Sequence, residues 1–434
     1  MDYQTSVQYI HHLPRLAKDG SLDRINTLLG ELGHPEFGQA YIHVTGTNGK
    51  GSVANAIAHI LEASGKTVGL FTSPFIMRFN ERFMIDHQQI PDAVLAVQTT
   101  AVAQALASLQ AADPAFVVTE FEFITALALR YFHMAHVDVA VIEVGIGGKE
   151  DSTNVILPQV AVITGVAMDH QALLGNTIES IATHKAGIIK PGVVAVTGEL
   201  PAAALEVVAK RVAQTHSPWQ RIGEDFTAGA ASVFDWGQRF DYQGAAGVIK
   251  AVTIPLMGTY QPGNFAVAIQ AAQAFCAQAH WPLAEQEIRQ GVQASTWPGR
   301  MEKISNAPLI ILDGAHNPQG VAGLIDTVHE LFGQTPLTVI AGVLKDKDVT
   351  TMVDALGHSE HRLWLVPVPD TPRATQADDY PQGVVHYPDW QTALSRYMHE
   401  FADEPLIITG SLYLVAAVRQ TLLGGHQHDP NRTV

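Results

Sequence analysis

Residues 41–53 read Tyr41-Ile-His-Val-Thr-Gly-Thr-Asn-Gly-Lys-Gly-Ser-Val53. A short apolar run gives way to a glycine-rich loop and then to a segment of good helix formers. This order predicts a strand, a phosphate-binding loop and a helix. The backbone N–H groups of such a loop can surround a polyphosphate, and the helix adds the positive end of its dipole.

The spacing of this loop differs from the general pattern G-x-x-x-x-G-K-[ST]. Val44 stands where the first glycine belongs, and Gly51 separates Lys50 from Ser52. Lys50 would supply a point charge to the phosphates, and Ser52 is placed to reach a magnesium ion. An ordinary glycine-rich turn is the alternative, but the lysine and both flanking segments favour a phosphate loop.

Composition limits the class of protein. With 434 residues the chain exceeds the size at which one core keeps growing, so two domains are expected. Apolar residues make up 47% of the chain, as in a packed globular protein. The formal net charge of −16 argues against nucleic acid or an anionic membrane as a partner, because both need a broad basic face.

The single cysteine and the N-terminal sequence bear on location. Cys276 cannot form an intramolecular disulfide, which fits a reducing compartment. No apolar signal segment follows Met1-Asp2, and no uninterrupted apolar run approaches the ~18 residues that span a bilayer. We therefore expect a soluble cytoplasmic protein.

Strand-like and helix-like segments alternate after an N-terminal part that is expected to be helical up to about Gly33. The strand-like runs are continuously apolar, which is typical of strands buried on both faces of a parallel sheet. Strands are predicted at 41–44, 67–71, 137–144, 160–166 and 193–196. Helices are predicted at 53–63, 91–110, 120–135 and 178–188.

Residues 219–255 differ from this pattern, because short alternating pieces between turns predict a peripheral antiparallel meander. A domain boundary is predicted near Trp297-Pro-Gly-Arg300, giving domains of residues 1–297 and 298–434. A second alternation follows, with strands at 309–312, 337–343, 362–368 and 406–409. The fold class is therefore α/β: a mostly parallel doubly wound sheet with a peripheral meander, and a smaller Rossmann-like C-terminal domain.

Polar residues gather at the carboxyl ends of the N-terminal strands, where doubly wound sheets bind ligands. Glu143 is one carboxylate in the otherwise apolar run 139–144. A buried charge needs a partner. A magnesium ion, bound directly or through water, fits the carboxylate oxygens. A salt bridge at the strand end is the alternative.

The glycines that follow, Gly145-x-Gly147-Gly148, suggest a dinucleotide site. The third glycine of G-x-G-x-x-G would fall at residue 150, which is Glu150. The dehydrogenase hypothesis is therefore weak.

The strand at 160–166 leads to Asp169-His170, and the helix after it carries Lys185 on its apolar stripe. A histidine in this place can bind metal or be purely structural. Lys185 can extend past the apolar face to solvent. Alternatively, it lies in a metal site, where its neutral amine can react with carbon dioxide and give a carbamate that binds magnesium.

Seven stretches carry a resemblance to a known enzyme family. They are His43–Ser52, Thr72–Arg82, Glu143–Gly148 with Asp151, Asp169-His170 through Lys190, Gln261-x-x-Asn264, Trp297–Arg300 and Asp313–Pro318. In this order they resemble folylpolyglutamate synthase, and the match continues to Ser411. The shifted phosphate loop is the form found in this family and in the related Mur ligases of cell-wall synthesis.

The resemblance implies formation of an amide bond at the expense of ATP. A substrate γ-carboxylate would take the γ-phosphoryl group, and the amine of L-glutamate would displace phosphate from the acyl phosphate. Negative charge develops on oxygen in both steps, so positioned cations and backbone donors would be the main catalytic resource. Reduced folate, ATP and glutamate are the implied substrates.

The resemblance also implies roles for individual residues. ATP would be bound by Gly49, Lys50, Gly51, Ser52, Asn264, Arg300 and Asp313. Two magnesium ions would be held by Ser52, Ser73, Glu143, His170 and a carbamylated Lys185. Catalytic roles would fall to Lys50, His170 and Lys185, and substrate contacts to Arg15, Arg82, His316 and Ser411. For Arg15 and Arg82, an arginine at the solvated surface fits the sequence equally well.

Other functions remain open at this stage. The enzyme could be bifunctional and also join glutamate to dihydropteroate. A Mur-type ligase is less favoured, because a loop at Gly46 leaves no room before it for a UDP-binding domain. A regulatory nucleotide-binding module or a phosphotransferase would not require Asp169, His170 and Lys185. We expect a monomer.

Overall fold

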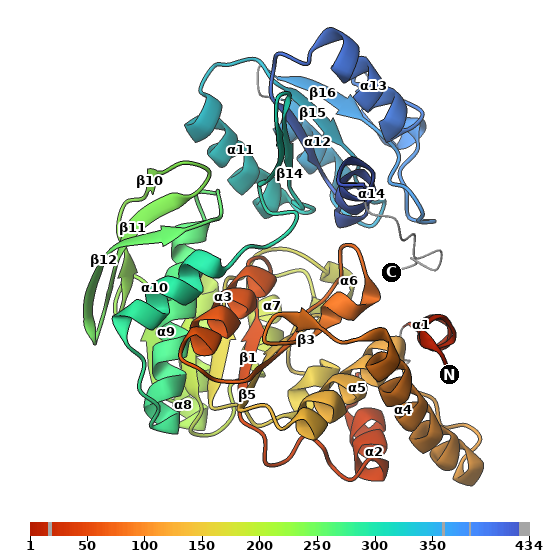
Figure 1. The fold of residues 1–434 in the computed structure, drawn as a ribbon, viewed down its shortest axis with the longest axis vertical. Helices are drawn as coiled ribbons and strands as arrows, with labels where there is room; N and C mark the ends of the chain where they lie inside the picture. Colours follow the sequence, from red (N-terminus) through yellow and green to blue (C-terminus); the bar gives the residue numbers. More distant parts are fainter. Residues whose placement is uncertain (16–19, 358–360, 382, 425–434) are drawn as a thin grey trace. The chain divides into compact units, whose positions relative to one another are not determined.

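The computed structural model describes residues 1–15, 20–357, 361–381 and 383–424. Contacts divide the chain into two compact units (Figure 1). The first unit comprises residues 1–232, 239–254 and 262–295, and the second comprises 233–238, 255–261 and 296–434.

The first unit is built on an eight-stranded sheet with the order β4-β3-β2-β5-β1-β6-β7-β8. The six strands that form its parallel part are β1 (Tyr41–Thr45), β2 (Val68–Phe71), β5 (Val139–Glu143), β6 (Val160–Ile163), β7 (Val194–Thr197) and β8 (Trp219–Arg221). An antiparallel hairpin, β3 (Phe83–Ile85) and β4 (Gln88–Gln89), extends one edge. β1, β2, β5, β6 and β7 are buried along their whole length. This confirms the predicted parallel sheet and its continuously apolar strands.

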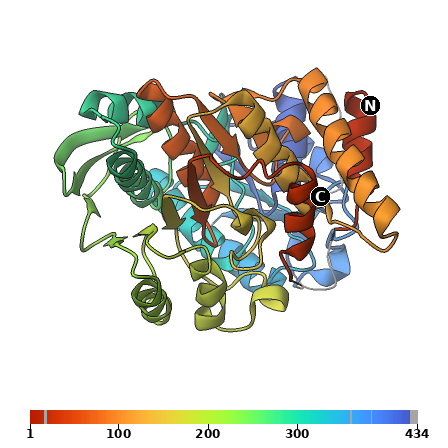
Figure 2. The same ribbon diagram turned by 90° about the horizontal axis from the view of Figure 1, so that it is seen from below.

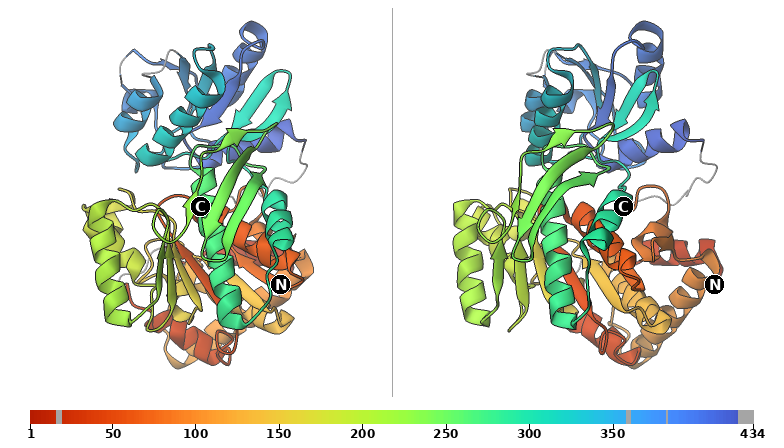
Figure 3. Two further views of the ribbon diagram at one scale, coloured as in Figure 1. Left: turned by 90° about the vertical axis from the view of Figure 1, so that its left-hand side faces the viewer. Right: turned by 60° about the vertical axis from the view of Figure 1, so that its left-hand side comes forward.

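Helices cover both faces of this sheet (Figure 2). Those of the first unit are α1 (Tyr3–His11), α2 (Asp23–Glu31), α3 (Lys50–Ala63), α4 (Asp92–Ala112), α5 (Glu120–Ala135), α6 (Gln171–Leu174), α7 (Ile178–Ala186), α8 (Ala202–Thr215), α9 (Gln261–Ala279) and α10 (Glu285–Ala294). Two short 3₁₀ helices, η1 (Phe79–Arg82) and η2 (Ser152–Val155), lie between them. The α3/α10 pair packs on one face of the sheet, and the α7/α8 pair packs on the other (Figure 3).

One of these helices, α4, is long and apolar enough to cross a membrane by length and composition. It packs against α1, α2 and α5 within the first unit, and residues such as Leu95 and Leu106 are buried there. Core helices of globular proteins share these properties.

The predicted meander exists but is shorter than expected. β9 (Thr227–Ala228), β10 (Ser232–Val233), β11 (Gln238–Gly244) and β12 (Gly247–Ile254) form a separate four-stranded sheet. The hydroxyl of Tyr242 on β11 donates to Oε1 of Gln270 on α9 at 2.6 Å, which ties the meander to that helix. Residues 219–221 were predicted in the meander, which is wrong, because they pair in parallel with β7 as β8.

The second unit has a six-stranded sheet with the order β13-β14-β18-β15-β16-β17. Its strands are β13 (Glu302–Asn306), β14 (Leu309–Leu312), β15 (Thr338–Ala341), β16 (Arg362–Leu365), β17 (Val385–His386) and β18 (Leu406–Thr409). Its helices are α11 (Pro318–Phe332), α12 (Val349–Gly357), α13 (Trp390–Glu400) and α14 (Leu412–Leu422), with η3 at Ala377–Asp379. Among the strands that the structure describes in this sheet, β13 alone pairs in antiparallel fashion, so the Rossmann-like α/β prediction is confirmed.

Two short segments that the predicted boundary assigned to the first domain pack within the second unit instead. Trp236 donates its indole N–H to the carbonyl oxygen of Met301 at 3.0 Å. The backbone N–H of Thr259 donates to Oγ1 of Thr327 at 3.1 Å. A single domain boundary at residue 297 therefore does not account for these two segments, because the residues that they contact lie far along the chain.

Candidate active site

The glycine-rich loop joins β1 to α3 as predicted, with Gly49 in the left-handed region at φ 83° and Lys50 as the first helical residue. Its path is fixed by the end of β6. The hydroxyl of Thr164 donates to the carbonyl oxygen of Asn48 at 2.5 Å. A Cβ on Gly46 would lie 1.9 Å from that same Oγ1, so only glycine fits this close approach.

The loop is also held by Thr47, whose N–H donates to the carbonyl oxygen of Gly165 at 2.9 Å. The hydroxyl of Thr47 donates to the carbonyl oxygen of Ala167 and accepts from its N–H. The sequence analysis missed the role of Thr47 and Thr164, although both are small hydroxyl residues directly after buried strands. A preorganised loop keeps its N–H groups in place without a further entropy cost on binding.

Lys50 lies where the predicted phosphate contact needs it. Its Nζ donates to the carbonyl oxygens of Gly46 and Thr47 at 3.0 and 3.3 Å. The ammonium group therefore lies over the loop itself. An anion in the loop would meet both this charge and the N-terminus of α3.

Glu143 is 3% exposed at the end of β5, as the sequence predicted for a buried carboxylate. Its Oε2 accepts from the backbone N–H of Ser73 at 3.0 Å, which brings the segment after β2 to the end of β5. Ser52 on the first turn of α3 is 4% exposed. The carboxylate and the hydroxyl groups are hard oxygen donors, the type that magnesium prefers.

Lys185 on α7 is 3% exposed, so it does not extend to solvent as the alternative supposed. It lines a small hollow together with residues of the phosphate loop, of the segments that follow β5 and β6, and of α6. The hollow is formed by Gly46, Thr47, Lys50, Gly145, Ile146, Gly147, Asp169, His170, Leu174 and Lys185. The structure thus brings together the three predicted catalytic residues Lys50, His170 and Lys185. The first and the last of them are 135 positions apart in the sequence.

The electrostatics of this hollow favour a neutral amine on Lys185. Burial lowers its pKa to about 7, and the positive charge of Lys50 acts in the same direction. Asp169 and Asp151 oppose this shift but do not cancel it. A lysine with such a pKa has an available nucleophilic lone pair near neutral pH.

His170 lies at the N-terminus of α6 with φ 48° and an exposed side chain. Its backbone N–H donates to Oδ1 of Asp169 at 2.9 Å, and its Nε2 lies 3.8 Å from Oδ2 of the same carboxylate. His170 is thus an exposed histidine that lines the hollow. The alternative, a structural histidine that is buried and hydrogen-bonded in the core, does not apply to His170.

The glycines after Glu143 serve helix packing. Gly147 has φ 71°, and a Cβ on Gly148 would lie 2.8 Å from the carbonyl oxygen of His184 and 3.1 Å from that of Lys185. The chain therefore passes directly against the last turn of α7. This close contact accounts for the glycine pattern without a dinucleotide.

We expect the substitution Gly148→Ala to push α7 away from β5 and to displace Lys185. The free energy of unfolding should fall by about 1–3 kcal/mol, as for other overpacked sites, and kcat should fall more than the stability loss explains. Urea unfolding with steady-state kinetics checks this. Gly357→Ala is the control, because among the described residues the nearest atom that a Cβ there would meet is Leu363 Cδ2, at 3.7 Å. Equal behaviour of the two variants would contradict the prediction.

Asp151 stabilises the glycine-containing loop that follows Glu143. It is 8% exposed and accepts from the N–H groups of Ile146 and Thr153 at 2.9 and 3.0 Å. The hydroxyl of Thr153 also donates to it at 2.5 Å and lies 2.9 Å from Nε2 of His43 on β1. Burial raises the pKa of Asp151, and these hydrogen bonds oppose the shift.

Asn264 on α9 lies beside the phosphate loop, as its predicted nucleotide role requires. A Cβ on Gly49 would lie 2.7 Å from Oδ1 of Asn264. Gly49 thus needs its lack of a side chain both for its backbone conformation and for this neighbour.

Arg82 ends η1 and is only 4% exposed. Its guanidinium lies over the rings of Phe75 and Phe79, at 5.1 and 5.6 Å from their centroids. The alternative of a solvated surface arginine is therefore wrong for Arg82. That alternative fits Arg15, whose side chain is exposed in the segment after α1.

The second unit holds its own cluster of predicted site residues. Asp313, 2% exposed at the end of β14, accepts from the N–H groups of Met301 and Ala315 at 3.0 and 2.9 Å. Burial raises the pKa of Asp313, while the positive charge of Arg300 opposes this. Tyr260, which the sequence analysis missed, is a further, partly buried neighbour. Burial raises the pKa of Tyr260 most, and the negative charge of Asp313 raises it further.

His316 and Ser411 belong to the same edge of the second sheet. Nδ1 of His316 donates to the carbonyl oxygen of Gly314 at 2.8 Å. Ser411 is the N-cap of α14, with its hydroxyl accepting from the N–H of Tyr413 at 3.2 Å. The N–H of Gly410 donates to the carbonyl oxygen of Ala315, which ties the two loops together.

Comparisons with known proteins agree with this geometry. Residues 44–272 match the Mur ligase middle domain, and residues 299–412 match the Mur ligase glutamate ligase domain. The folylpolyglutamate synthase of Lacticaseibacillus casei is 57% identical over 98% of this chain and 100% of its own length. The dihydrofolate synthase/folylpolyglutamate synthase of Bacillus subtilis is 34% identical over 97% and 99%.

Solved structures give the same result. An FPGS-AMPPCP-folate complex superposes with a TM-score of 0.91 at 56% identity, covering 98% of this chain and all of that one. Mycobacterium tuberculosis folylpolyglutamate synthase complexed with ADP gives a TM-score of 0.89 at 31% identity, covering 98% and 99%. The match in sequence, fold and domain order shows that the chain belongs to the folylpolyglutamate synthase family of Mur ligases.

Proposed function

We propose that this chain is an ATP-dependent ligase that adds L-glutamate to the γ-carboxylate of a reduced folate or folylpolyglutamate, with ADP and phosphate as the other products. The observation that carries the proposal is the hollow where Lys50, His170 and Lys185 meet the phosphate loop. It occurs in a chain that is 57% identical over almost its full length to a folylpolyglutamate synthase.

The reaction follows from what these residues can hold. The loop N–H groups and Lys50 bind the triphosphate and present its γ-phosphorus to the folate γ-carboxylate. Attack by a carboxylate oxygen breaks the bond between the β,γ-bridging oxygen and phosphorus, which gives ADP and an acyl phosphate. The neutral amine of glutamate then attacks the acyl carbon, phosphate leaves, and the amine proton is released.

Magnesium fits the oxygen donors around the phosphate loop. The buried carboxylate of Glu143 and the hydroxyl groups of Ser52 and Ser73 are of the type that Mg²⁺ prefers, and His170 faces the same hollow. We propose two ions held by these residues and Lys185. When bound, the ions would neutralise charge on the phosphate oxygens.

Lys185 is proposed to act as a carbamate. Its neutral amine would add to carbon dioxide, forming an N–C bond and releasing one proton, so that a buried neutral amine becomes an anion. The lowered pKa supports this step, because only the neutral amine reacts. A carbamate next to Lys50 would also remove the repulsion between the two lysines.

The remaining assignments are proposals of the same kind. Asn264, Arg300 and Asp313 would contact the nucleotide, and His316 and Ser411 the incoming glutamate. Arg82 and the exposed Arg15 would meet the folate carboxylates and pterin. We also propose that the enzyme is cytoplasmic and monomeric.

Replacing Arg82 with glutamine should raise KM for folate at least about tenfold, since a hydrogen bond to a charged group contributes about 1.5–3 kcal/mol. KM for ATP should change little. Arg289→Gln is the matched control, because Arg289 forms an ion pair with Glu285 on α10. Equal effects of the two substitutions on folate KM would rule out the assignment of Arg82.

Phosphate release tests the function itself. Purified protein with ATP and Mg²⁺ should release phosphate only when both a reduced folate and L-glutamate are present. Hydrolysis of ATP that does not depend on folate would contradict the ligase. Mass spectrometry of the folate product should show the added glutamate.

A second activity is favoured by one relative. The Bacillus subtilis protein, 34% identical over nearly the whole chain, is named both dihydrofolate synthase and folylpolyglutamate synthase. Parallel assays with dihydropteroate and with methylenetetrahydrofolate separate the two activities. Product from dihydropteroate would make the enzyme bifunctional.

A further inference from the structure

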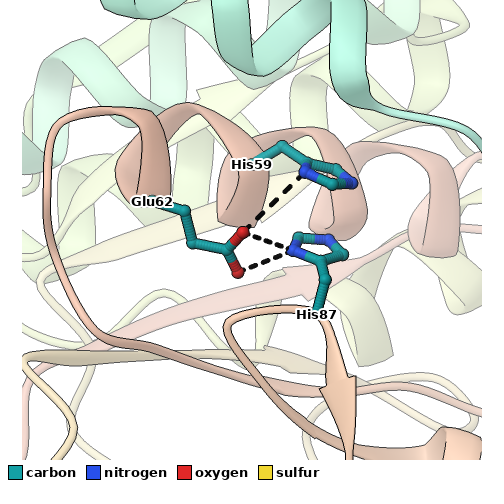
Figure 4. A group of neighbouring side chains, drawn as sticks. All are labelled: His59, Glu62 and His87. Atoms are coloured by element: carbon teal, nitrogen blue, oxygen red, sulfur yellow. Dashed lines mark hydrogen bonds and ion pairs between the residues drawn. The ribbon is translucent and has the colours of Figure 1, made fainter.

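Three side chains with metal-binding groups gather at the far end of α3 from the phosphate loop (Figure 4). His59 and Glu62 lie on the last turns of the helix, and His87 lies at the turn of the β3–β4 hairpin. Their ligand atoms, one from each residue, all lie within 4.8 Å of one another. Each side chain is partly buried.

His87 lies between two polar neighbours. Its Nε2 is 3.0 Å from Oδ1 of Asn55, and its Nδ1 faces both carboxylate oxygens of Glu62, at 2.6 and 2.5 Å. A carboxylate this close to a ring nitrogen favours a proton or a metal ion between the two groups.

His59 adds a second nitrogen donor in the same place. Its ring stacks on that of His87, with centroids 3.3 Å apart and planes 12° apart, and its Nδ1 lies 3.8 Å from Oε2 of Glu62. The imidazole of His59 can serve as a metal ligand through a ring nitrogen, as histidine commonly does.

The spacing fits a small tetrahedral ion. Bonds of about 2.1 Å that meet at about 109° place neighbouring ligand atoms about 3.4 Å apart. The two distances from Glu62 Oε2, 2.5 Å to His87 and 3.8 Å to His59, lie on either side of this value. A movement of the Glu62 side chain by about 1 Å, together with rotation of one imidazole out of the stack so that the two nitrogen lone pairs converge, gives the tetrahedral arrangement.

Backbone structure holds the three donors in place. Asp86 and His87 have φ of 48° and 54°, which forms the tight hairpin turn. Oδ1 of Asp86 accepts from the N–H of Val68 at 2.8 Å, so the turn is attached to β2. On α3, His59 and Glu62 are three positions apart and share one face.

We propose that His59, Glu62 and His87 form a binding site for a divalent first-row transition-metal ion, with Zn²⁺ as the best fit. Two imidazoles and one carboxylate form the donor set that such ions favour over Mg²⁺, and a water molecule completes four-coordination. The site is separate from the phosphate loop, because Glu62 follows Lys50 by about 18 Å along the helix at 1.5 Å per residue.

The ion would link the β3–β4 hairpin to the helix that begins at the phosphate loop. The hairpin starts directly after Arg82 and forms the edge of the sheet. A bound ion would therefore stabilise an otherwise short edge element. Asn55 would fix the tautomer of His87 through its hydrogen bond, as partners of metal-binding histidines commonly do.

Calorimetric titration of the full chain with ZnCl₂ tests the proposal. The protein is first stripped with chelator, then held with ADP and excess Mg²⁺ so that the oxygen-rich site at the phosphate loop is occupied. We expect the unchanged protein to bind one more Zn²⁺ than Glu62→Gln or His87→Gln, or to bind it at least tenfold more tightly. Control protein His399→Gln, altered at an exposed histidine on α13, should match the unchanged protein.

A measurement on the unchanged protein alone keeps the test valid if a variant fails to fold. Zn²⁺ should protect His59 and His87 from diethyl pyrocarbonate, as located by peptide mass spectrometry, and leave His399 reactive. Co²⁺ in place of Zn²⁺ should give the visible absorption of a four-coordinate ion. The proposal would be overturned if Zn²⁺ did not bind, or if it bound equally to the unchanged protein and to both site variants. It would also be overturned if Zn²⁺ did not change the modification of His59 and His87.

Discussion

Replacing Lys185 with alanine should lower kcat by about 10²–10³-fold or more, the range seen when one preorganised electrostatic group is removed from an active site. The Kd for ATP should change little. Lys185 lines the hollow beside the phosphate loop but belongs to α7, whereas the loop is held by Thr47 and Thr164. With the carbamate proposed above, the substitution removes a negative charge near the reacting groups and leaves the loop intact.

Single-turnover phosphate release gives the rate of the chemical step, and calorimetry with a non-hydrolysable nucleotide gives Kd. Lys149→Ala is the matched control, because Lys149 is an exposed lysine on the neighbouring loop. A loss of nucleotide affinity as large as the loss of kcat would assign Lys185 to phosphate binding instead.

The carbamate proposed for Lys185 gives this prediction a second readout. Because burial lowers the pKa of Lys185 to about 7, its amine is mostly protonated below pH 7 and mostly neutral above it. The unmodified enzyme, freed of carbon dioxide at acidic pH, should regain activity on addition of bicarbonate above pH 7. Small carboxylic acids should partly restore Lys185→Ala, because they can occupy the space of the missing carbamate; no response to either would argue for a plain lysine.

The central sheet could be predicted from sequence because its chemistry is local. Buried parallel strands are continuously apolar, and the glycine-rich loop, Glu143 and Asp169 lie at or shortly after the ends of such runs. Lys185 could be placed from helical spacing, since it shares a stripe with Ile181 and Ala182. Parallel strands end at the same edge of the sheet, so these separate signals converge there.

What sequence reasoning missed depends on contacts between distant segments. Residues 219–221 have no distinctive pattern, and only pairing with β7 makes them a strand of the main sheet. Packing brings Tyr260 near Asp313 and Arg300, although about fifty positions of sequence separate Tyr260 from Asp313. The burial of Arg82 likewise depends on the rings of Phe75 and Phe79 folding over it, which composition does not indicate.

Replacing Lys50 with alanine should weaken ATP binding by about 1.5–3 kcal/mol, the usual contribution of a hydrogen bond to a charged group. This corresponds to a rise in Kd of about 10- to 150-fold. Nζ of Lys50 is already held over the loop by its hydrogen bonds to the carbonyl oxygens of Gly46 and Thr47. A bound phosphate would therefore interact with the positive charge of Lys50 without a rearrangement of this side chain. Lys210→Ala, at an exposed position on α8, is the control, and an unchanged Kd in Lys50→Ala would refute the phosphate contact.

The same substitution should also act on Lys185. The positive charge of Lys50 helps to lower the pKa of Lys185, so its removal should raise that pKa and leave less neutral amine near pH 7. Lys50→Ala should therefore need a higher pH or more bicarbonate to reach its maximal kcat, while its ATP affinity stays low under all these conditions. If bicarbonate and pH change kcat equally in Lys50→Ala and in the unchanged enzyme, the two lysines act independently and only the phosphate contact is lost.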